Sequence, residues 1–152
     1  MTRIRVAAVA MLTLALAVPA AGCGGDDDTD QFREDYNAAV DRLSKVNTDI
    51  GQATGGASGQ SNSAIAKQFQ RIADTAEETR NKLAKLDPPE DAKEEFDSLL
   101  SALDKGIDDL EAVSKAAKKS DPAAAAQAVQ SLSKSGQEIT AAENALKQAV
   151  DG

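Results

Sequence analysis

Apolar residues recur every three or four positions along almost the whole chain after residue 30, and this spacing is the strongest constraint on its fold. Such spacing places the apolar residues on one face of an α-helix, whereas a half-buried strand would alternate apolar and polar residues. The clearest example steps by four and three through seven positions: Ile65, Phe69, Ile72, Ala76, Thr79, Leu83 and Leu86. The sequence therefore predicts an all-α protein.

Four segments carry this pattern, and the residues between them favour turns. We expect helices over about 30–50, 64–86, 88–119 and 121–150. Short connections make consecutive helices antiparallel, so the simplest arrangement is a four-helix up-down bundle. The segment from Gly51 to Ser63 holds four Gly and three Ser among thirteen residues, and it is expected to be a mobile loop.

The other two connections carry signals for the start of a helix. Asp87-Pro88-Pro89-Glu90 and Asp121-Pro122 each place an acidic N-cap before a proline in the first turn, and Glu90 would complete a capping box. The topology places the Pro88-Pro89 turn and the C-terminus at one end and the two other turns at the opposite end. Because the last two helices are predicted to be longer, their hairpin is expected to project beyond the first two.

The composition fits close-packed helices. Aromatic residues make up 3% of the chain and Trp is absent, whereas Ala is abundant. Small side chains allow helices to approach closely, and Ala has the highest helix propensity. Gly106 and Gly136 fall inside predicted helices, where they cost helix stability but would permit a close backbone contact.

Charge and residue types exclude several functions. The formal net charge is −8, which disfavours nucleic acid as a partner, because binding it requires Lys and Arg to neutralise phosphates. The chain has no His and one Cys, so Ser-His and Cys-His catalysis and His-ligated metal sites are excluded. Its two methionines, Met1 and Met11, precede the helical part. The sequence therefore predicts no catalytic, cofactor or metal site, and no enzyme.

The N-terminal residues are typical of an export signal. Arg3 and Arg5 precede an apolar run from Val6 to Ala21, which is too short to span a membrane as a helix. The run ends in Ala20-Ala21-Gly22-Cys23, which resembles the lipobox of bacterial lipoproteins. We expect a signal peptide over 1–22 and lipidation of Cys23. The alternative is ordinary signal cleavage, which would leave a free thiol at Cys23.

Residues 23–30 are expected to form a flexible, acidic, lipid-anchored tether before the helical domain at 31–152. The run Gly24-Gly25-Asp26-Asp27-Asp28-Thr29-Asp30 lacks the alternating ligands of a Ca²⁺-binding loop, so a solvated tether is the preferred interpretation. With a lipid at Cys23, the domain would sit on the outer face of the cell membrane despite its negative charge.

One uncharged stretch suggests a contact surface. From Pro122 to Ser133 the fourth predicted helix carries no charged residue, whereas the third is rich in acids. Such a surface could pack against another protein or against a second copy of the chain. The alternative is that an Ala-rich helix is simply a stable helix.

Several of these features together resemble small lipoproteins of high-GC Gram-positive, actinobacterial type. The resemblance covers the Ala-rich signal, Cys23-Gly24-Gly25-Asp26-Asp27-Asp28, the Lys85–Pro89 turn and the Phe96–Leu103 repeat. Many of those proteins end in a second cysteine, which this chain lacks. The resemblance implies export, lipidation and a helical bundle, and it implies no activity, because the family has none assigned.

Two functions are consistent with these features. The first is a non-enzymatic interaction or scaffold module of the cell envelope, held to the membrane by its N-terminal lipid and bound to an envelope protein. The second is a carrier of a small apolar or lipid ligand, in a cavity left by small side chains at Ala76, Ala92, Gly136 and Ala142. The partner and the oligomeric state are not determined by the sequence.

Overall fold

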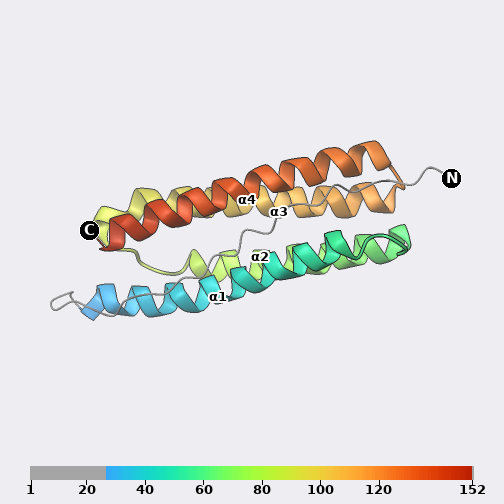
Figure 1. Ribbon diagram of the computed structural model, residues 1–152. Coiled ribbons are helices and arrows are strands. Elements are labelled where there is room, and N and C mark those ends of the chain that lie inside the picture. Colours follow the sequence, from blue (N-terminus) through green and yellow to red (C-terminus); the bar gives the residue numbers. More distant parts are fainter. Residues whose placement is uncertain (1–26, 152) are drawn as a thin grey trace.

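The computed structural model describes residues 27–151, and this part of the chain folds into four α-helices and one short 3₁₀ helix without any strand (Figure 1). The elements are α1 (Asp27–Gly55), α2 (Asn62–Leu83), η1 (Glu90–Ala92), α3 (Lys93–Lys118) and α4 (Pro122–Asp151). The predicted all-α class is confirmed. None of the described helices is both long and apolar enough to cross a membrane.

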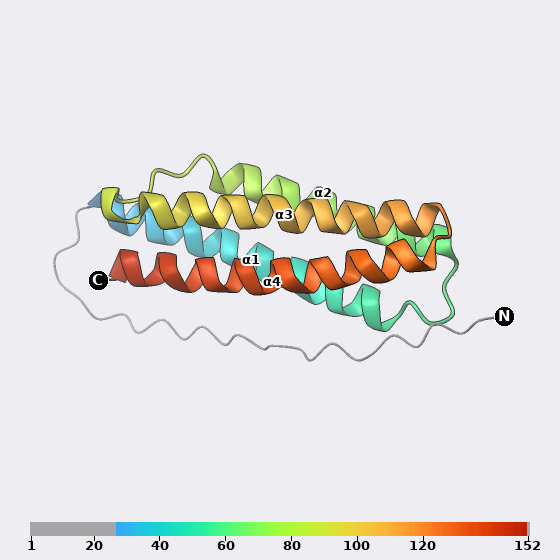
Figure 2. The same cartoon turned by 90° about the horizontal axis from the view of Figure 1, so that it is seen from above.

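Consecutive helices run in opposite directions and pack in chain order. α1 lies against α2, α2 against α3, and α3 against α4. Two views related by a right angle show the α1–α2 pair beside the α3–α4 pair, with all four axes roughly aligned (Figures 1 and 2). α1 and α4 are not among the pairs that pack closely along their length. The bundle is therefore least closed on the side between α1 and α4.

Two hydrogen bonds identify the ends of the bundle. At one end the Arg33 guanidinium of α1 donates to the carbonyl of Val150 near the end of α4, at 2.7 Å. At the other end the Asn62 amide donates to the Ser120 hydroxyl at 2.9 Å, which joins the start of α2 to the turn between α3 and α4. The predicted pairing of the ends is confirmed.

The core consists of two apolar clusters. One is centred on Phe69, Ile72, Leu110 and Val113, and it receives Val46 from α1. The second lies nearer the C-terminus and is built from large side chains with small ones between them: Phe32, Ala39, Leu83, Ala92, Phe96, Leu99, Leu103 and Leu146. The Phe32 and Phe96 rings meet edge to face with centroids 5.7 Å apart, which ties α1 to α3.

α1 is longer than the sequence indicates, and the prediction of a loop from Gly51 is wrong. The helix continues to Gly55 because Ala53 is buried in the core, 1% exposed, and because Thr54 donates a hydrogen bond to the carbonyl of Ile50. Packing of Ala53 offsets the poor helix propensity of Gly51 and Gly55. Only residues 56–61 separate α1 from α2.

The predicted projection of the last two helices is also wrong. α1 has 29 residues and α4 has 30, so the two hairpins reach the same end (Figure 1). The bond between Asn62 and Ser120 holds the two turns together there.

The helix boundaries follow local capping with one exception. Asp121 caps α4, because its carboxylate accepts from the amides of Ala123 and Ala124. Asp87 does not cap α3: the chain stays non-helical through Pro89 and enters α3 through η1, and neither η1 nor α3 has a side-chain cap bond. Two successive prolines remove backbone donors there, and the residue before each proline is pushed away from helical angles.

α3 ends in a Schellman motif with an unusual residue. The amides of Ser120 and Asp121 donate to the carbonyls of Ala117 and Ala116. Ser120 occupies the left-handed position, with a φ of 55°, where glycine is normally preferred. Its hydroxyl accepts the bond from Asn62, which gives a serine at this position a structural role.

Candidate functional site

Cys23, to which the sequence assigns a role, lies outside the described residues, as do the expected signal peptide and the first part of the tether. The described chain begins four residues later at Asp27, where α1 starts, so residues 27–30 of the predicted tether are helical. Acidic residues in the first turn of a helix interact favourably with the positive end of its dipole.

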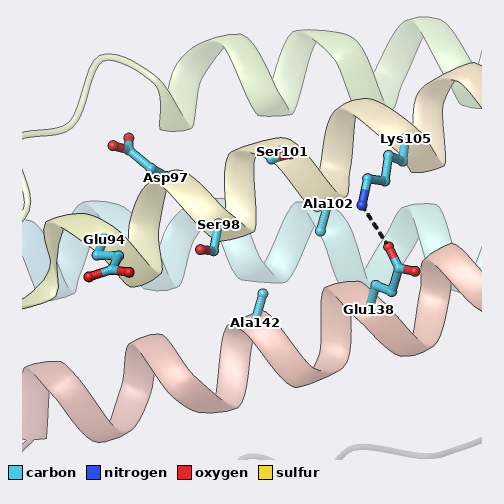
Figure 3. Close-up of a pocket in the computed structure, with 8 residues that line it drawn as sticks. All are labelled: Glu94, Asp97, Ser98, Ser101, Ala102, Lys105, Glu138 and Ala142. Carbon is cyan, nitrogen blue, oxygen red and sulfur yellow. Dashed lines mark hydrogen bonds and ion pairs between the residues drawn. The ribbon is translucent and has the colours of Figure 1, made fainter.

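An open groove of about 730 Å³ runs along the outer side of α3 and α4 (Figure 3). Ala102 and Ala142 face one another across it, and their small side chains leave the space between the helices. The Lys105 ammonium and the Glu138 carboxylate close one end with a 3.0 Å ion pair. The remaining lining is polar and comes from one face of α3: Glu94, Asp97, Ser98 and Ser101.

A second, smaller groove of about 290 Å³ continues past this ion pair. Here the Ser135 hydroxyl donates to the Asp109 carboxylate at 2.5 Å, and Lys134 lies 3.8 Å from Glu138. The pKa of the Glu138 carboxyl is lowered mainly by the hydrogen bond that Lys105 donates to it and, to a smaller extent, by the positive charge of Lys105. A carboxyl held ionised in this way is poorly suited to donate a proton near neutral pH. These contacts join α3 to α4 and account for the polar groups without a reaction.

The described residues contain no cluster of three or more His, Cys, Asp or Glu side chains that could hold a metal ion. The adjacent acid pairs on α3 point in different directions, since neighbours on a helix are about 100° apart. Asp108, for example, is exposed, whereas Asp109 turns inward and accepts the bond from Ser135.

The edge between α1 and α4 carries partly buried polar groups. Burial raises the pKa of the Tyr36 hydroxyl, and the negative charge of Glu143 on α4 adds to this effect. Burial also raises the pKa of the Glu143 carboxyl. Tyr36 stacks on Phe32 with ring centroids 5.8 Å apart, as expected of a residue on the apolar face of α1. Arg33 completes this edge through its bond to Val150 and lies 3.6 Å from Asp151.

The four small residues invoked for a ligand cavity do not face a common interior. Ala76 and Ala92 are buried in different core clusters. Ala142 packs against the same cluster as Ala92 but also lines the outer groove, and Gly136 is exposed with open space where a side chain would stand. Of Gly106 and Gly136, only Gly106 supports a close approach, because a Cβ there would lie 3.1 Å from Ile139 Cδ1. The carrier function remains a prediction from the sequence.

α4 presents a continuous uncharged surface to solvent. We define the α4 outer face as a row of exposed residues at steps of four and three: Ala126, Gln130, Ser133, Gln137, Ala141, Asn144 and Gln148. The row runs from Ala126 to Gln148, and the 22 steps between these residues span about 33 Å at 1.5 Å per residue. No member carries a charge.

The comparison with α3 shows how unusual this surface is for the molecule. Of ten exposed residues in α3, eight are charged, whereas only Lys134 and Asp151 are charged among fifteen exposed residues of α4. α4 is also shallowly buried, with three buried residues, Ala128, Ser135 and Leu146, in its thirty.

No protein-family model, curated protein or solved structure matches this chain. The assignment of a function therefore rests on its own residues.

Sequence reasoning located only the first part of the α4 outer face. The uncharged stretch from Pro122 to Ser133 ends at Lys134, and the later charges Glu138, Glu143 and Lys147 obscure the pattern in a linear reading. The structure shows that Lys134, which is 79% exposed, and Glu138 lie beside the row at the edge of the second groove, while Glu143 lies toward Tyr36 of α1. The uncharged row therefore continues as far as Gln148, three residues before the exposed Asp151 that ends α4.

Proposed function

We propose that this chain is a lipid-anchored protein of the outer face of the cell membrane, whose helical body acts as a non-enzymatic interaction or scaffold module of the cell envelope. The observation that carries the interaction role is the α4 outer face, an uncharged surface about 33 Å long on an acidic protein. Exposed helix surfaces of soluble domains are usually charged, as on α3. A long exception marks a place where another molecule is expected to pack.

The anchor rests on the residues around Cys23. A basic start, an apolar run and the Ala20-Ala21-Gly22-Cys23 sequence together favour export and lipidation. Each buried methylene of an acyl chain contributes about 0.8 kcal/mol to membrane binding, so two or three chains would hold the body against the repulsion of anionic lipids. The resemblance to actinobacterial lipoproteins supports the same anchor.

The anchor is tested by comparing Cys23→Ser with Gly25→Ser in cells that produce the full chain. We expect Cys23→Ser to leave the membrane fraction and to lose the mass of the lipid, because the acceptor sulfur is gone. Gly25→Ser, which keeps the thiol, should stay with the membrane. If the wild-type chain carries no added mass, or if Cys23→Ser remains membrane-bound, the anchor is refuted.

The interaction role is tested by cross-linking in intact cells. The wild-type chain should be captured in a defined complex, and Gln127→Glu combined with Gln130→Glu should reduce that capture, since it places charge on the uncharged surface. The matched control combines Asn81→Asp with Asn47→Asp, which adds the same two negative charges to exposed positions of α2 and α1. Equal capture of the α4 variant and the control would refute the interaction role of α4.

A further inference from the structure

The residues of the α4 outer face follow a regular spacing along the helix. Its steps are 4, 3, 4 and again 4, 3, 4, which are two 11-residue repeats between Ala126 and Gln148. This repeat averages 3.67 residues per turn, so on a helix of 3.6 residues per turn the row drifts by about 20° per repeat, or about 40° between Ala126 and Gln148. A second helix would therefore follow the same residues with a slight right-handed supercoil.

A partner that contacts the whole α4 outer face meets no charged side chain among the seven residues of the row. A basic or acidic partner would be matched by fixed charges of the opposite sign, which the α4 outer face does not offer. The chain has a net charge of −8, so two copies repel one another through their charged surfaces. The uncharged face is the surface through which a second copy approaches at the lowest electrostatic cost.

The residue types of the row suit contact with an identical row. In a symmetric pair of parallel helices, each residue at the seam faces its own copy, so any charge there would meet a like charge. A Gln or Asn amide carries both donors and acceptors and can hydrogen-bond to its own copy. Amides at Gln130, Gln137 and Asn144 would then set the register, as buried polar residues do in coiled coils. Ala126 and Ala141 would let the backbones approach closely.

We propose that the α4 outer face binds a second copy of this chain, with the two α4 helices side by side and parallel. The parallel direction rests on the proposed lipid anchor, because two copies held at the same end by one membrane point the same way. Anchoring also raises the effective concentration of the copies, so a weak contact suffices.

Single cysteines introduced into the full chain in cells test the pairing. Gln130→Cys, Gln137→Cys and Asn144→Cys are each expressed from two differently tagged copies and treated with a short bismaleimide. We expect each α4 variant to form a doubly tagged product of twice the chain mass. The exposed controls Asn81→Cys on α2 and Asn47→Cys on α1 should not. Products at the controls as well, or products of another mass only, would overturn the proposal.

The same variants distinguish the two possible directions. In a parallel pair all three positions cross-link to themselves. In an antiparallel pair only a residue near the centre does so, and Gln130→Cys would instead cross-link to Asn144→Cys. That second outcome would overturn the parallel arrangement.

A charge exchange tests whether the uncharged seam is the cause. Asn144→Cys chains that also carry Gln130→Glu and Gln137→Glu, or Gln130→Lys and Gln137→Lys, should each lose at least about tenfold in cross-linked product, since like charges then face one another. Co-expression of the Glu and Lys versions should restore the product. Unchanged cross-linking in either version alone would overturn the proposal, and far-UV circular dichroism checks that both versions remain helical.

The native Cys23 separates this inference from the proposed function. A chain without an added cysteine should form no product, because a lipidated sulfur does not react with maleimide. If this chain does form a cross-linked product, the proposed lipid anchor is refuted, and the cross-linking of the α4 variants is then measured in chains that also carry Cys23→Ser. Membrane-bound chains whose α4 cysteines never cross-link would overturn the pairing and leave the anchor intact.

Discussion

Truncation of two leucines in α4 tests the shallow burial of this helix. Leu146 is fully buried, 0% exposed, in the cluster near the C-terminus, whereas Leu132 is partly exposed and packs on the edge of the other cluster. Both substitutions, Leu146→Ala and Leu132→Ala, change the helix propensity of α4 equally. Their difference therefore reports packing alone.

The magnitudes follow from the carbon atoms removed. Leu→Ala deletes three carbons, and at about 0.8 kcal/mol each the lost burial of Leu146 amounts to about 2.4 kcal/mol. The cavity left in a fully packed site adds to this loss, so we expect the free energy of unfolding to fall by about 3 kcal/mol. Leu132 already exposes part of its surface, and its truncation leaves a space open to water. We expect a loss of about 1 kcal/mol there.

Urea unfolding followed by far-UV circular dichroism measures both losses. With a slope of about 2 kcal/mol per M, the midpoint should fall by about 1.5 M for Leu146→Ala and by about 0.5 M for Leu132→Ala. The slope itself should stay constant. Equal shifts of the two variants would contradict the difference in burial between Leu146 and Leu132.

Two further predictions concern polar burial and glycine. Burial raises the pKa of the Glu143 carboxyl, so the folded protein holds this proton more tightly than the unfolded chain, and stability is lost as the pH rises from the ordinary glutamate range through the raised pKa. Glu143→Gln should therefore raise the free energy of unfolding at neutral pH and flatten this pH dependence. Glu78→Gln, at an exposed site of α2, should do neither. Gly136→Ala should stabilise the protein by up to about 1 kcal/mol in the same urea assay, because α4 gains helix propensity and nothing lies within 4 Å of the added carbon. Gly106→Ala should gain less, since its Cβ would lie 3.1 Å from Ile139 Cδ1, and an equal gain at both sites would contradict the close approach of α3 and α4.

Local rules predicted the elements well where the signal lay within a few residues. The spacing of Phe96, Leu99, Leu103 and Leu110 placed the apolar face of α3, and all four are buried. Asp121 and Pro122 marked the start of α4 for the expected reason, a carboxylate that accepts backbone amides. The prediction that Asp87 caps the third helix was wrong. Two consecutive prolines keep the chain non-helical through Pro89, so the helix begins later than the capping sequence indicates.

By itself, the sequence determined the all-α class, the order and direction of the helices and the residue types that the chain lacks, because helical periodicity, turn residues and composition are local properties. Only the tertiary structure decided how far α1 extends and which side of α4 stays exposed, since Ala53 is held in a helix by a core formed from distant segments. The same holds for charge: Lys134 and Glu138 interrupt the uncharged stretch in the sequence, but both lie beside the row, where Glu138 pairs with Lys105 of α3. Which side of a helix is exposed depends on how the helices pack, so the uncharged row along α4 could be recognised only from the packing of α4 against α3.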